Sequence, residues 1–108
     1  MDLTESKKGN YLVVKVAGRL DTSNFGELEK RLLENIEKGE KEIVIDCSEL
    51  NYISSSGLRV FLMVLKKVSA TGGHLHLCCL QDTISEIFEI AGFNSIFKIF
   101  VTLEEATK

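Results

Sequence analysis

At 108 residues the chain is long enough for one hydrophobic core and too short for two, which predicts a single domain over residues 1–108. A net charge of −3 argues against a nucleic-acid-binding surface, and no apolar run is long enough for a membrane span. The first ten residues contain no apolar signal region, and the three cysteines are odd in number with two adjacent. These features predict reduced thiols and a cytoplasmic protein.

Strands and helices are predicted to alternate in the first half of the chain. A turn at residues 8–10 precedes a strand over residues 11–16, and a short hairpin with the residues before the turn is one option. Residues 21–24 offer several helix caps, and the helical spacing that follows ends at Gly39. The continuous apolar run at residues 43–45 is typical of a central strand covered on both faces.

The second half continues the alternation. A helix is predicted over about residues 56–69 and a strand over residues 74–80. Thr83 and Glu86 have the spacing of a capping box for a third helix, which would stop at Gly92. A last short strand is predicted at residues 96–101, followed by one helical turn capped by Thr102. Strands alternating with helices indicate an α/β sheet with crossover connections.

The helix over residues 56–69 has more apolar side chains than one buried face requires. Helical spacing places one set toward the core: Leu58, Phe61, Leu62, Leu65 and Val68. Val60 and Met63 fall outside that stripe, and we interpret them with two neighbouring cations as a docking patch of Arg59, Val60, Met63 and Lys67. The alternative is that Val60 and Met63 are covered by a loop or are isolated exposed apolar residues.

Three serines open this helix, directly after a buried strand and a short loop. The hydroxyl of a serine in a first helical turn lies among unpaired backbone N–H groups, at the positive end of the helix dipole. Such a position favours a negative charge, for example a phosphoryl group. The structural alternative is that Ser54, Ser55 and Ser56 act only as helix caps.

Two motifs resemble the STAS family, in particular the bacterial anti-sigma factor antagonists. The first is D-x-S-x-x-x-[YF]-[IM]-[DS]-S-[STA]-G-[LI], which reads here Asp46, Ser48, Tyr52, Ile53, Ser54, Ser55, Ser56, Gly57 and Leu58. The second is G-x-[LI]-D, present as Gly18-Arg19-Leu20-Asp21. The resemblance extends from Tyr11 to about Leu103 and implies a small mixed β-sheet with helices packed mainly on one side.

The resemblance also implies partner switching. The unphosphorylated protein would bind an anti-sigma factor that is also a serine kinase, and so free a sigma factor. Phosphorylation of Ser55 would then dissociate the complex, and a PP2C-type phosphatase would reset it. ATP would be bound by the kinase, so this chain would need no cofactor and supply no catalytic group. The resemblance places Asp21, Ser54, Ser56 and Gly57 on the partner-facing surface, with Ser54 where the best-studied antagonists have an aspartate.

Three other interpretations of the sequence are an accessory subunit, an enzyme and a metal-binding protein. An accessory subunit that binds a transporter ATPase would use the same fold. An enzyme acting through Ser55 would need a histidine base, but there is no G-x-S-x-G motif, and the only histidines are on a different predicted strand. His74, His76 and Cys78 share one strand face, yet no further ligand pair accompanies them, so we predict no metal site.

Overall fold

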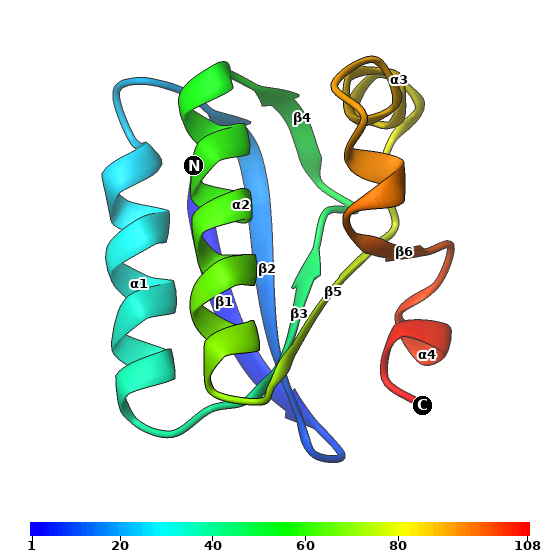
Figure 1. The fold of residues 1–108 in the computed structure, drawn as a ribbon. Coiled ribbons are helices and arrows are strands. Elements are labelled where there is room, and N and C mark those ends of the chain that lie inside the picture. The colour runs from blue at the N-terminus through cyan, green and yellow to red at the C-terminus, as the bar shows by residue number, and fades with distance from the viewer.

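The longest strand, β2 (Tyr11–Leu20), organises the sheet of the computed structural model, which describes residues 1–108. The strand order is β1-β2-β3-β5-β6, and β4 pairs with the end of β2 beyond β3. Only β1 runs antiparallel to its neighbour; the other pairs are parallel (Figure 1). The other strands are β1 (Asp2–Lys8), β3 (Glu42–Asp46), β4 (Leu50–Ile53), β5 (His74–Cys78) and β6 (Lys98–Phe100).

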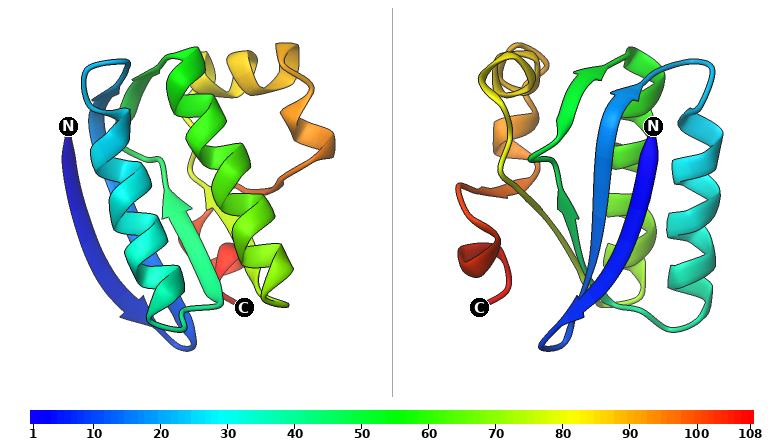
Figure 2. Two further views of the ribbon diagram at one scale, coloured as in Figure 1. Left: turned by 60° about the vertical axis from the view of Figure 1, so that its left-hand side comes forward. Right: turned by 180° about the vertical axis from the view of Figure 1, so that it is seen from behind.

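Two helices, α1 (Phe25–Glu37) and α2 (Ser55–Ala70), cover one face of the sheet (Figure 1). The short α4 (Leu103–Ala106) lies on the opposite face, against β5 and β6 (Figure 2). Helix α3 (Asp82–Ile90) and the 3₁₀ turn Phe93–Ser95 close one end of the core. The helices are therefore mainly on one side of a mixed sheet, as the family resemblance implied.

The core divides between the two faces of the sheet. In β3, Ile43 and Ile45 point into the large core beneath α1 and α2, while Val44 packs with Cys78 and Ala106 on the other face. Ile43, Val44 and Ile45 are all fully buried. The run of three apolar residues therefore reflects a strand covered on both sides, which confirms the interpretation of that run.

Some local predictions were wrong. The hairpin of β1 with β2 is present, but β4 was not foreseen in the loop before the serines. Helix α3 begins at Asp82, one residue before Thr83, so Thr83 does not cap it. The residue before the helix is Gln81, whose side-chain amide donates a hydrogen bond to the Ser48 carbonyl (3.0 Å). Thr102 does cap α4, accepting from the Glu105 amide at 3.2 Å.

Candidate functional site

The first turn of α2 is fixed to the end of β2 through Ser54. Its amide donates to the Leu20 carbonyl at 2.9 Å, which aligns the chain as it leaves β4. The Ser54 backbone is extended, and its hydroxyl oxygen accepts from the Gly57 amide at 3.3 Å. Ser54 is therefore the helix N-cap. The alternative that the serines act as caps is confirmed for this residue.

The other two serines have different surroundings. Ser56 is half-buried, and its Oγ lies 3.5 Å from Thr22 Oγ1 in the loop before α1. Ser55, the first residue of α2, is exposed and its hydroxyl has no hydrogen-bond partner within the protein. The helix has no acidic residue in its first turn, so its amide dipoles face solvent at Ser55 without a neutralising carboxylate. Of the three hydroxyls, that of Ser55 is the one without a hydrogen-bond partner in the protein.

Asp21 organises the neighbouring loop. Its Oδ1 accepts from the Ser23 hydroxyl (2.6 Å) and the Ser23 amide (3.0 Å), and both bonds lower the pKa of the Asp21 carboxyl. The Asp21 carbonyl accepts from the Phe25 amide at 2.9 Å, which begins α1. Thr22 of this loop is the residue that meets Ser56, so the loop and the serine turn form one surface.

An aromatic residue borders the same surface. Arg19 on β2 and Tyr52 on β4 are paired across the strands, and the guanidinium carbon lies 4.0 Å from the centre of the Tyr52 ring. Arg19 Nε is also 3.7 Å from Asp21 Oδ2. Tyr52 remains 39% exposed. Arg19, Thr22 and Tyr52 were not assigned to the site from the sequence; the pairing of β4 with β2, which brings Arg19 and Tyr52 together, was the missing information.

Two of the residues predicted to face a partner need correction, one from the docking patch on α2 and one from the serine turn. Val60 is only 2% exposed and belongs to the core, so it cannot be part of a docking surface. Gly57 is buried as well, because the helix makes its closest approach to Leu20 and Ile53 there. Arg59 and Lys67 are exposed and Met63 is half-buried, so these three residues remain on the outer side of α2.

The buried stripe of α2 is therefore rotated from the predicted one. Its buried members are Gly57, Val60, Phe61, Val64 and Val68. Leu58, Leu62 and Leu65, which were assigned to the core, are only half-buried at its edges. This rotation turns Leu62 outward, next to Met63.

The histidines are distant from Ser55. Helix α2 runs from Ser55 to Ala70, so its two ends are about 22 Å apart. Ser55 begins the helix, whereas His74 begins β5 after the helix has ended. His74 Nδ1 lies 2.9 Å from both Glu42 carboxylate oxygens, and His76 Nδ1 lies 2.8 Å from the Ala106 carbonyl. Neither imidazole is placed to act as a base for Ser55.

The ligand atoms of the three residues considered as metal ligands, His74, His76 and Cys78, do not come together as one group. Cys78 groups instead with Asp46 and Cys79, whose ligand atoms all lie within 4.8 Å of one another. Burial is the main cause that raises the pKa of the Cys78 thiol, and the neighbouring Cys79 adds to it. The group that forms therefore differs from the one considered in the sequence.

Comparisons with known proteins identify the family of this chain. A family model described as the STAS domain matches residues 3–106. The "Putative anti-sigma factor antagonist BtrV" of Bordetella bronchiseptica is 41% identical over 106 residues, which cover 98% of this chain and 91% of BtrV. None of the helices is long and apolar enough to cross a membrane.

Two solved structures show the same fold. The crystal structure of tm1081 from Thermotoga maritima has a TM-score of 0.92 at 22% identity and covers 96% of this chain and 90% of that one. The phosphorylated form of the Bacillus protein SpoIIAA has a TM-score of 0.77 at 20% identity, covering 97% and 96%. The predicted fold class, a small mixed sheet of this family, is confirmed.

Proposed function

The chain belongs to the STAS family, and we propose that it is an anti-sigma factor antagonist switched by phosphorylation of Ser55. The observation that carries this proposal is the exposed, unbonded Ser55 hydroxyl at the start of α2, beside two serines that already have structural roles. The relative BtrV, 41% identical, bears the name of an anti-sigma factor antagonist and supports the same function.

In this proposal the protein acts by binding and supplies no catalytic group. The unphosphorylated form binds an anti-sigma factor that is also a serine kinase, and the sigma factor is released. ATP belongs to the kinase, which transfers its γ-phosphoryl group to Ser55. A PP2C-type phosphatase removes that group and restores binding. The three free cysteines suit the reducing cytoplasm where such a cycle would take place.

The proposed partner surface surrounds Ser55. Asp21 and Ser56 contribute from the loop and the first helical turn, Ser54 fixes that turn, and Arg59 lies one turn further along α2. A phosphoryl group on Ser55 adds about −1.5 to −2 charges at neutral pH. The free amide groups of α2 favour that charge within this chain, whereas a partner packed over the turn would have to desolvate it. Phosphorylation should therefore weaken the complex and leave the fold intact.

The test is phosphate mapping with the purified anti-sigma factor kinase of the same organism. With ATP, mass spectrometry should detect one phosphoryl group on Ser55, and Ser55→Ala should accept none. Ser56→Ala is the matched control and should still be phosphorylated. A kinase that neither binds nor modifies the protein would contradict the proposal, and binding to a transporter ATPase without phosphate uptake would favour that other function.

A further inference from the structure

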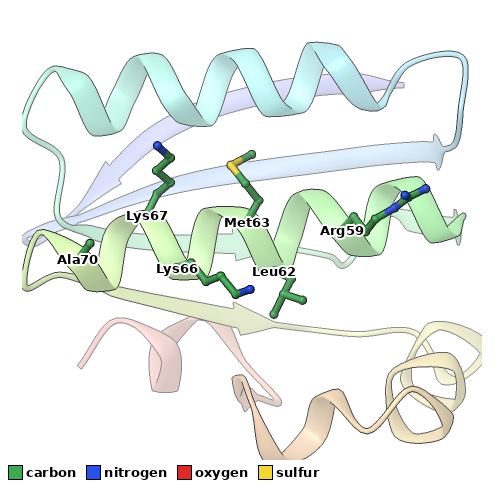
Figure 3. A pocket seen from close by; sticks show the side chains of 6 residues that line it. All are labelled: Arg59, Leu62, Met63, Lys66, Lys67 and Ala70. Carbon is green, nitrogen blue, oxygen red and sulfur yellow. The ribbon is translucent and has the colours of Figure 1, made fainter.

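A groove of about 500 Å³ follows the solvent-facing side of α2 beyond the serine turn (Figure 3). Six residues line it: Arg59, Leu62, Met63, Lys66, Lys67 and Ala70. Ala70 is 15 residues after Ser55, which corresponds to about 22 Å along the helix axis. The groove therefore extends much further along α2 than the surface formed by the serines and the Asp21 loop.

The floor of the groove is apolar. Leu62 and Met63 are half-buried; their inner parts pack against the core and their outer parts face solvent. They lean to opposite sides of the helix, Met63 toward α1 and Leu62 away from it (Figure 3). Met63 adds an unbranched, polarizable side chain that adapts to different partners. A floor of this kind suits a partner that brings apolar side chains of its own.

The rim of the groove is positively charged, and the fold does not neutralise it. Arg59, Lys66 and Lys67 are the only charged residues of α2, which contains no aspartate or glutamate. None of the three takes part in an ion pair, although five other lysine and arginine residues of the protein do. Three unpaired cations are thus concentrated on one helix of a chain whose net charge is −3.

We propose that this groove binds an acidic, amphipathic segment of the anti-sigma factor kinase, with its apolar side chains on Leu62 and Met63 and its carboxylates on the cationic rim. The inference rests on the proposed function, and it extends the contact region along α2 from Arg59, one helical turn beyond Ser55, to Ala70, about four turns beyond it. An amphipathic segment matches both the apolar floor and the charges beside it. A second copy of this chain does not, because pairing the α2 faces would bring like charges together.

The test compares charge-reversal variants by calorimetric titration against the purified kinase at 50 and 300 mM salt. We expect Lys66→Glu/Lys67→Glu to weaken binding at low salt about tenfold or more, since attraction is replaced by repulsion. Ala70→Glu, at an exposed groove position, should weaken binding in the same direction. Added salt should weaken the unmodified complex most and the Ala70→Glu complex less, and it should not weaken the Lys66→Glu/Lys67→Glu complex, in which the charges repel.

The matched control is Lys30→Glu/Lys98→Glu, which makes the same charge change at exposed positions outside the groove that form no ion pair. It should bind nearly as the unmodified protein does. Equal affinity of the groove variants and this control, with Ser55 phosphorylation still abolishing binding, would overturn the groove and keep the proposed function. A kinase that binds no form of the protein would overturn both.

Discussion

The side chain of Leu20 occupies the space in which a Cβ atom on Gly57 would lie. A Cβ built at Gly57 would be 2.9 Å from Leu20 Cγ and Cδ2, and 2.8 Å from Ile53 Cγ1. Glycine therefore lets α2 begin directly against the ends of β2 and β4. This close approach also determines which side of α2 is buried and where Ser55 faces solvent.

The first prediction concerns this contact. Gly57→Ala should destabilise the protein by about 1–2 kcal/mol, because overpacking of the core outweighs the better helix propensity of alanine. The matched control is Gly26→Ala, since Gly26 is also helical but has open space where its Cβ would lie. That variant should gain up to about 1 kcal/mol. Urea unfolding measures both values, and equal effects would contradict the packing role of Gly57.

A second prediction separates Val60 from the outer side of α2. Val60→Ala should lower the free energy of unfolding by about 2–3 kcal/mol, because Val60 is almost fully buried. Met63→Ala should cost less, since part of that side chain is already in water. Chemical denaturation of the two variants provides the comparison. A neutral Val60→Ala would restore the docking role that the sequence suggested for this residue.

The difficulty with α2 shows the limit of periodicity. Both apolar stripes fit helical spacing, and Phe61 and Val68 belong to each, so the pattern alone could not choose between them. The choice depends on how closely the helix approaches the sheet, which is determined at Gly57. The signal was present as a glycine inside the first turn, but its meaning requires the position of Leu20, which is distant in sequence.

The ease of predicting β3, β4 and the serine turn depended on whether the signal was local in the sequence. The run Ile43–Ile45 has only apolar residues and predicted a central strand correctly. β4 was missed because its four residues are buried only at the two ends, which gives no strand periodicity to detect, and its pairing with β2 is non-local. Ser55 could be predicted as exposed at a helix start, whereas the contact of Ser56 with Thr22 needs tertiary structure.

A third prediction concerns the thiols. Cys47 and Cys78 are buried and Cys79 is half-buried, so a thiol reagent should modify Cys79 first in the native protein. Cys47 and Cys78 should react only when the protein unfolds. Mass spectrometry of the peptides after brief labelling, with and without denaturant, identifies the sites. Rapid native labelling of Cys47 would contradict its burial.

A fourth prediction follows from the Cys47 pKa, which burial raises well above its ordinary value. Because the thiol is protonated in both states below about pH 8.5, its contribution to stability is complete there. Above that pH the unfolded chain releases the proton while the folded chain keeps it, so stability falls. The loss from this thiol should grow as the pH rises further. Urea unfolding at pH 7 and 9.5 should show a smaller decline for Cys47→Ala than for the unmodified protein.

The last prediction is the effect of charge at Ser55 on the complex with the anti-sigma factor kinase. An unpaired charge forced into an interface costs about 3–5 kcal/mol, and each 1.4 kcal/mol is a factor of ten. Phosphorylated protein should therefore bind at least about 100-fold more weakly than unmodified protein. Ser55→Asp should lose part of this affinity, because it adds one charge instead of nearly two. Ser55→Ala should keep the affinity of the unmodified protein, since the Ser55 hydroxyl makes no bond that the fold needs.

Calorimetric titration of the four forms measures these differences, and thermal unfolding of each shows whether the fold survives. Equal affinities among four folded forms would rule out the switch, while a loss of affinity in Ser55→Ala would show that the hydroxyl itself contacts the partner.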